Sequence, residues 1–256
     1  MVKSFFGIIT LLLSVQLSAQ GIPLAQPRFD CKGVFFQTET EVGLEFDMDG
    51  AKVFYTINGS KPKLYKRPFK INKTSRLYAF ASHPDFGRGD TASLTLQKVK
   101  LKPVSLNLKT NPNPEYKAMG ANSLIDFEAG GNDLHDGKWV GFLSDSVVLE
   151  AVFPEKTPLN TVTVSVLNNP GAWVLPMRKI SVYTAVEEGG NWLAAGSWMP
   201  EVGRGASSQI RWFPEVQVKR RVTRVKLVID SFGPLPSGHP GAGNPAWLFL
   251  DEILFN

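Results

Sequence analysis

The chain has 256 residues, 43% of them hydrophobic, and a formal net charge of +5. Its single cysteine, Cys31, excludes an intramolecular disulfide, and its length fits one large or two ordinary domains of about 100–200 residues each. Nucleic-acid binding needs such charge on one face, together with aromatic stacking partners. The Lys/Arg-rich residues 61–76 and 219–226 fall instead in a turn-rich hairpin region and in an alternating strand, which indicates solvated loops and strand faces. The positive net charge is compatible with binding to an acidic polysaccharide or to an anionic cell surface.

Residues 1–20 predict a secretory signal. One early cation, Lys3, precedes an apolar run from Phe5 to Leu17 and a small-residue exit at residues 17–20. Cleavage at this exit would remove the apolar run. We therefore expect a secreted, periplasmic or cell-surface protein without a membrane span.

Alternating apolar side chains predict short β-strands on both sides of residue 100. The pattern covers residues 42–46, 53–57, 77–79, 162–166 and 180–182. No stretch keeps a helical period for three turns.

Turn residues separate these strands, among them the pairs Asp49-Gly50 and Asn58-Gly59. Short strands with such turns indicate β-sandwiches, and a Lys- and Pro-rich segment at residues 98–119 indicates the joint between two of them. The expected parts are a first module at residues 21–100, a lead-in at 101–118 and a second module at 119–256.

The chain ends in a buried strand that carries two acids. Eight of the fifteen residues at 231–245 are Gly or Pro, and an almost wholly apolar strand follows. An unpaired buried charge is costly, so Asp251 and Glu252 should each reach solvent, pair with a base or bind a cation. In a regular strand they would point to opposite faces, which argues against a catalytic pair. That alternation assigns Trp247, Phe249, Asp251, Ile253 and Phe255 to one face, and Leu248, Leu250, Glu252 and Leu254 to the other.

Three motifs near the N-terminus resemble a known family. They are YTINGSKP at Tyr55 to Pro62, LYKRPFKI at Leu64 to Ile71 and LYAFAS at Leu77 to Ser82. Together they resemble the small immunoglobulin-like domain at the C-terminal end of chitobiases and β-hexosaminidases. The resemblance implies an Ig-like β-sandwich for the first module.

Three further motifs resemble a second family. They are LIDFEAGGNDLHDGKWVGF at Leu124 to Phe142, GAWVLP at Gly171 to Pro176 and HPGAGNPAWLFLDEI at His239 to Ile253. In this order they resemble the discoidin-type domain, a relative of coagulation-factor type C domains that is appended to some bacterial β-N-acetylhexosaminidases. The resemblance implies an all-β chain, an Ig-like sandwich followed by a discoidin-like jelly roll.

The same resemblance implies binding without catalysis. In those enzymes the catalytic carboxylates lie in a separate barrel of about 250 residues, for which this chain has no room. We expect an exported accessory protein that recognises N-acetylhexosamine- or galactose-type glycans through the second module. The alternative is a scaffold that docks beside a separate glycoside hydrolase or envelope protein.

Sugar binding requires a flat aromatic ring and polar groups on loops. Trp173, after a turn, and Trp192, in a hairpin, are the best candidates for exposed platforms. His135 and His239 could contact hydroxyl groups, although a lone histidine is more often structural. Arg178 and Trp139 complete the candidate set, and core packing competes for Trp139 and for Trp247.

The discoidin resemblance also implies a structural Ca²⁺. The positions that match its ligands are Asp126 and Glu252, with Asp133 as a third candidate. Ca²⁺ binds six to eight oxygens, which loops can supply. The alternative is that Glu252 pairs with a base such as Arg178 or Arg224. The usual Asp-Gly turn is replaced here by Asp126-Phe127, and no cysteine or third histidine lies near enough in sequence to predict zinc.

Overall fold

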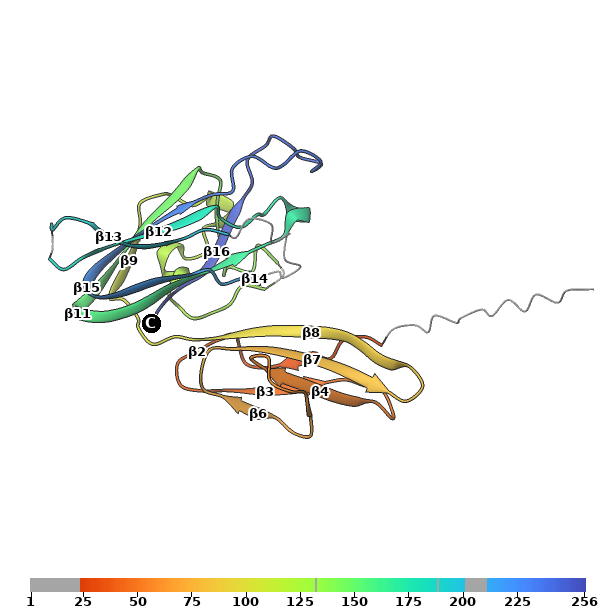
Figure 1. The fold of residues 1–256 in the computed structure, drawn as a ribbon. Helices are drawn as coiled ribbons and strands as arrows, with labels where there is room; N and C mark the ends of the chain where they lie inside the picture. The colour runs from red at the N-terminus through yellow and green to blue at the C-terminus, as the bar shows by residue number, and fades with distance from the viewer. Residues whose placement is uncertain (1–23, 132, 188, 201–210) are drawn as a thin grey trace, which may run out of the picture.

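A computed structural model describes residues 24–131, 133–187, 189–200 and 211–256. The expected signal at residues 1–20 lies outside the described residues. Within the described part of the chain, no helix is long and apolar enough to cross a membrane. The strands form two modules that follow one another along the chain (Figure 1).

The first module is a sandwich of two sheets around a small core. Val42, Ile71, Leu77 and Leu96 are buried between the sheets. One sheet has three strands: β1 (Arg28–Asp30), β3 (Thr40–Glu45) and β6 (Phe69–Ile71). The other has five: β2 (Phe35–Phe36), β8 (Gly87–Lys98), β7 (Ser75–His83), β4 (Lys52–Ile57) and β5 (Lys63–Leu64).

The second module is one hydrogen-bonded sheet folded into two layers. Two long antiparallel strands make the fold: β11 (Ser146–Leu167) and β15 (Glu215–Asp230). Their register shifts between Val152 and Thr157, where the pair turns from one layer into the other. The other strands are β9 (Ser105–Leu108), β10 (Val140–Phe142), β12 (Lys179–Ala185), β13 (Leu193–Trp198), β14 (Arg211–Trp212) and β16 (Leu248–Phe255).

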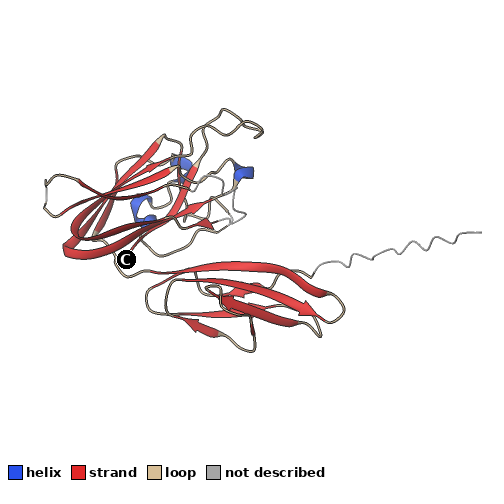
Figure 2. Ribbon diagram, in the orientation of Figure 1, coloured by secondary structure: helices blue, strands red, loops and turns tan. Residues whose placement is uncertain are grey.

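The described helices are short 3-10 turns, which agrees with the lack of helical periodicity (Figure 2). They are η1 (Pro114–Tyr116), η2 (Gly120–Leu124) and η3 (Pro170–Ala172). The predicted fold class, an Ig-like sandwich followed by a jelly-roll sandwich, is confirmed.

The segment expected as a lead-in, residues 101–118, contributes to the second module. Its strand β9 pairs with β11, and Leu106 is buried in the second module's core. The chain therefore enters the jelly roll soon after β8 ends at Lys98.

A small apolar cluster, which we call the seam, joins the modules. Phe35 and Val99 pack against Leu254 of the last strand, and Phe127 and Phe213 lie beside them. The Phe35 and Phe213 rings meet edge to face, with centroids 6.2 Å apart. Next to the seam, the Leu101 N–H donates to the Phe255 carbonyl at 3.0 Å.

The Asn58-Gly59 turn offers a test of the first module's local structure. Gly59 has φ +75°, and a Cβ placed on it would meet no atom within 4 Å. Gly59→Ala should therefore cost about 1–2 kcal/mol from backbone strain alone. Gly33→Ala is the matched control, because Gly33 has equal space and no positive φ. Calorimetric unfolding should show a loss for Gly59→Ala and almost none for Gly33→Ala; equal effects would contradict the strain argument.

Candidate functional site

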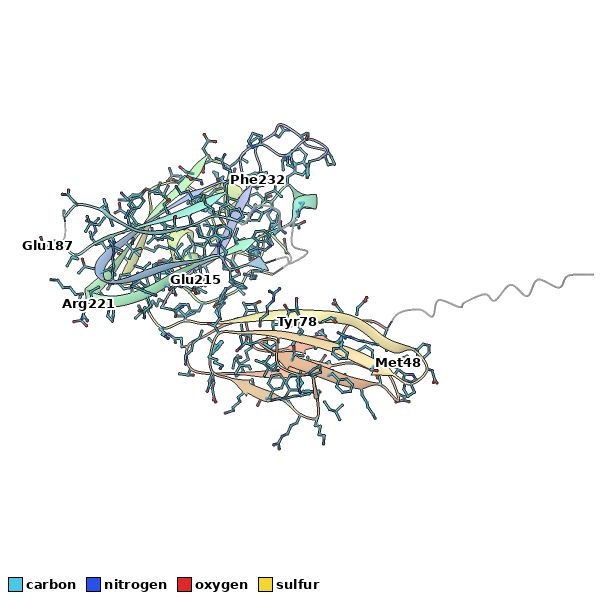
Figure 3. The ribbon with its side chains drawn as sticks, in the orientation of Figure 1. Met48, Tyr78, Glu187, Glu215, Arg221 and Phe232 are labelled. Atoms are coloured by element: carbon cyan, nitrogen blue, oxygen red, sulfur yellow. The ribbon has the colours of Figure 1, made fainter. Side chains whose placement is uncertain are left out.

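The aromatic candidates lie at two ends of the second module. Strand β12 pairs with β15 from Lys179 opposite Asp230 to Ala185 opposite Arg224. Trp173 precedes the first of these ends, and Trp192 follows the second in the β12–β13 hairpin. Figure 3 labels Phe232, near the first end, and Glu187, near the second, and the two residues lie far apart. The two indoles therefore do not share a site.

We call the end formed by residues 110–139, 168–178 and 231–247 the loop end. Trp173 is its most exposed tryptophan, at 39%. It has φ +63°, which costs a bulky residue roughly 1–2 kcal/mol. Two backbone bonds hold it: its N–H donates to the Pro170 carbonyl and its carbonyl accepts from Trp247, both at 2.9 Å. The surrounding loops thus keep an exposed ring in a strained conformation.

His239 positions Trp173. Its Nε2 lies 2.9 Å from the Pro170 carbonyl, and its Nδ1 accepts the Gly241 N–H at 3.0 Å. Its ring meets the Trp173 ring edge to face at 6.2 Å. Both ring nitrogens are occupied, so His239 braces two loops instead of contacting a hydroxyl group as expected.

A second aromatic group adjoins Trp173 through the backbone of Trp247. The Tyr116 ring lies 4.9 Å from His135 and 5.3 Å from Trp247, centroid to centroid. Tyr116 and Trp247 are half-buried, whereas the His135 side chain is 65% exposed. Sequence reasoning missed Tyr116. The signal was Asn113-Pro114, because Asn113 caps η1 and so places Tyr116 at its end.

Trp139 is a structural residue and not a platform. It is 1% exposed and lies against Gly130, where an added Cβ would fall 2.3 Å from its ring. Its indole N–H donates to the Gly131 carbonyl at 3.0 Å. This burial corrects the expectation that Trp139 contacts a ligand.

Arg178 is exposed but fixes a loop. Its Nε donates to the Ser231 carbonyl at 2.7 Å, at the start of the Gly/Pro-rich loop. Its guanidinium also approaches Gly233. Arg178 thus orients residues 231–247 beneath Trp173.

The last strand contains a β-bulge at the two acids. Its register against β11 shifts between Glu252, opposite Ser165, and Leu250, opposite Val166. Leu250 and Ile253 both enter the main core, so the alternation changes phase between them. The expected assignment to opposite faces is therefore wrong: the extra residue leaves Asp251 and Glu252 on the side away from that core.

Asp251 pairs with a base, as expected. Its carboxylate is 0% exposed, forms an ion pair with Arg211 and accepts the Gly130 N–H at 2.9 Å. The Arg211 guanidinium also donates to the Gly130 carbonyl and covers the Trp139 ring at 4.8 Å. Burial lowers the pKa of Arg211 to about 10, so it stays charged at neutral pH.

Glu252 has no basic partner among the described residues. It is 0% exposed; Oε2 accepts the Phe127 N–H at 2.7 Å, and Oε1 has no hydrogen-bond partner. Burial, with the nearby Asp126 carboxylate, raises the pKa of Glu252 to about 9. The alternative partners are engaged elsewhere: Arg178 with Ser231, and Arg224 with Glu150 at 3.0 Å.

The predicted calcium ligands come together only in part. Asp126 lies near Glu252, since the Asp126 carboxylate disfavours the charged form of Glu252. Asp133 instead accepts the His135 N–H at 2.9 Å, and its side chain is 72% exposed. Within the described ranges, no three His, Cys, Asp or Glu side chains gather to hold a metal ion. The unpartnered Oε1 beside Asp126 still fits an oxygen-binding cation that takes its other ligands from backbone carbonyls.

Comparison with known proteins supports the first module's resemblance. Residues 32–93 match the model of the chitobiase/β-hexosaminidase C-terminal domain. This match covers about a quarter of the chain and includes the Tyr55 to Pro62 hairpin. No curated protein matches the chain in sequence.

Solved structures resemble the chain at low identity. A SusE-like protein has 10% identity and a TM-score of 0.39, with coverage of 89% of this chain and 95% of that chain. The chitosan-binding module 1 of a chitosanase/glucanase from Paenibacillus sp. IK-5 has 11% identity and a TM-score of 0.37, with coverage of 61% and 96%. The CBM32 of AlyQ, in complex with 4,5-unsaturated mannuronic acid, has 10% identity and a TM-score of 0.39, with coverage of 60% and 95%.

Glu252 predicts a pH-dependent stability. Its ordinary pKa of 4.5 applies to the unfolded chain and about 9 to the folded chain, so between these values only the unfolded state releases the proton. The free energy of unfolding should fall as pH rises across this window, by up to about 1.4 kcal/mol per pH unit. Below the unfolded pKa both states hold the proton, so the free energy of unfolding no longer changes with pH through this group.

Glu252→Gln tests this expectation, because glutamine keeps an acceptor for Phe127 and does not titrate. Urea unfolding of both proteins, at several pH values within the window and with a chelator present, should show a fall for the wild type alone. Tryptophan fluorescence reports the second module, which contains all six tryptophans. Parallel pH profiles would contradict the assignment.

Proposed function

We propose that this chain is an exported, non-catalytic accessory protein whose second module binds carbohydrate at the loop end. The observation that carries the proposal is Trp173. Its ring is 39% exposed and is held in a left-handed backbone conformation by His239 and the Trp247 backbone. Strain of this kind persists where the surrounding structure maintains it, and it clusters at functional sites.

An exposed indole suits one face of a sugar ring. Sugars present C–H groups on a face that packs against aromatic rings, while their hydroxyl groups need polar partners at the rim. The exposed His135 imidazole, next to the Tyr116 ring, provides such a partner. We propose N-acetylhexosamine- or galactose-type residues as ligands, because both present an apolar face to such a ring.

The positions of the two buried acids support a structural role for their carboxylates. Hydrolysis of a glycosidic bond requires two carboxyl groups on either side of the bond, about 5–10 Å apart. Asp251 and Glu252 are adjacent, fully buried and bonded to the backbone of the same loop. This arrangement favours binding over catalysis.

Trp173→Ala should weaken glycan binding about tenfold, because the ring's stacking contact is worth about 1.4 kcal/mol. A glycan array identifies the ligand, and calorimetric titration then measures the affinity. Phe86→Ala is the matched control, because Phe86 is an aromatic residue of the first module that is 49% exposed. Wild-type affinity in Trp173→Ala, or no binding to any glycan, would contradict the proposal.

A second pair of variants separates the ring's position from its presence. A Cβ on Gly241 would lie 2.7 Å from the Trp173 ring, so Gly241→Ala should displace the ring and weaken the same binding. A Cβ on Gly171, in the neighbouring loop, would meet its nearest atom at an ordinary 3.7 Å. Gly171→Ala should therefore bind as the wild type does.

We also propose that Asp126 and Glu252 hold a structural Ca²⁺. The cation would supply a partner for the unpartnered Oε1 and keep Glu252 ionised. At neutral pH, Ca²⁺ should raise the melting temperature of the wild type and not that of Glu252→Gln, as differential scanning fluorimetry with and without chelator can show. An equal shift in both proteins would place the ion elsewhere, and no shift in the wild type would exclude the site.

A further inference from the structure

We propose that a second surface of the jelly roll binds an acidic polysaccharide, a chain of sugars with uronate or sulfate groups. We call this surface the basic aromatic face and define it by Tyr183, Trp192, Arg224 and Lys226. It lies away from the loop end and differs from it in charge, so it adds a ligand class to the proposed function.

Strand register builds the face. Tyr183 on β12 stands opposite Lys226 on β15, and Lys226 stands opposite Glu150 on β11. Asn107 on β9 lies next to Glu150. These residues point outward, because their neighbours along the strands, Val182, Leu227 and Leu149 among them, are buried in the core. Adjacent strands lie about 4.8 Å apart, so the row spans about 14 Å, which is longer than one sugar ring.

Two aromatic rings flank one ammonium group on this face. The Lys226 Nζ lies 5.1 Å from the Tyr183 ring centroid and 4.7 Å from that of Trp192. No carboxylate of a described residue lies within ion-pair distance of it. Lys226 is therefore fixed in place, with its charge uncompensated by a neighbour.

The neighbouring charges add to this excess. The Arg224 guanidinium lies 5.1 Å from the Trp192 centroid and shares Glu150 with Lys109, at 3.0 and 3.7 Å. Two cations thus share the Glu150 carboxylate, and Lys226 stands beside them without an ion pair of its own among the described residues. Arg224 and Lys226 meet the same indole ring and repel each other, so an anion bound between them would lower the electrostatic energy.

The mixture of rings and cations favours an acidic sugar chain over other anions. Trp192 and Tyr183 can pack against sugar rings, while Arg224 and Lys226 pair with carboxylate or sulfate groups. Both aromatic side chains are half-buried and keep part of their surface in solvent. A sheet face without a deep pocket suits a polymer that makes several weak contacts in a row.

Polygalacturonate tests the proposal, with its methyl-esterified form as the neutral counterpart. In affinity gel electrophoresis the acidic polymer should retard the wild type, and added salt should weaken this effect. Lys226→Gln and Trp192→Ala should each weaken binding about three- to tenfold. Arg76→Gln is the matched control, because Arg76 also covers an aromatic ring, at 5.2 Å over Tyr78 in the first module, and its loss changes the net charge equally.

Three outcomes would overturn the proposal. Equal weakening in Arg76→Gln would mean that only net charge acts, and equal retardation by the esterified polymer would remove the role of the anion. Tighter binding of single-stranded DNA, lost in Lys226→Gln, would assign the face to nucleic acid. Because the neutral-glycan assay depends on Trp173 and this one on Lys226, either function can fail without the other.

Discussion

The arrangement of the second module depends on how the last strand buries two adjacent acids. The bulge in β16 leaves Asp251 and Glu252 on the side away from the main core. Residues 126–131 cover them: the N–H groups of Gly130 and Phe127 donate to Asp251 and Glu252. Because a buried carboxylate without such donors is very unfavourable, the loop and the strand have to fold together.

This contact organises residues at some distance from it. Gly130, bonded to Asp251, has no side chain, and the Trp139 ring packs in the space that a Cβ would occupy. The aromatic layer then continues outward, because Phe249 packs with Trp139 and also touches Tyr116 and Trp247. The aromatic rings of the loop end thus pack outside Phe249 and Trp139, and Trp139 lies against Gly130, whose N–H bonds to Asp251.

Sequence patterns predicted the strands, the turns and the two modules, because these depend on local alternation and on turn residues. They also predicted that Asp251 would reach solvent, pair with a base or bind a cation, but they could not identify its partner, Arg211, which lies 40 residues away. The face assignment failed at the bulge, since an extra residue in a strand has no local signature. The separation of Trp173 from Trp192 follows from strand β12, which runs from one end of the sheet to the other between their loops.

Asp251 and Glu252 differ in how their charges are compensated, and Glu252 lies next to the joint between the modules. Arg211 forms an ion pair with Asp251, whereas no described residue forms one with Glu252, and the nearby Lys102 does not offset the effect of its burial. The residue that bonds to Glu252 is Phe127, which has φ +67° and packs in the seam beside Phe35. A strained residue keeps its conformation only while its contacts hold. Phe127 thus connects the Glu252 carboxylate to the cluster that joins the two modules.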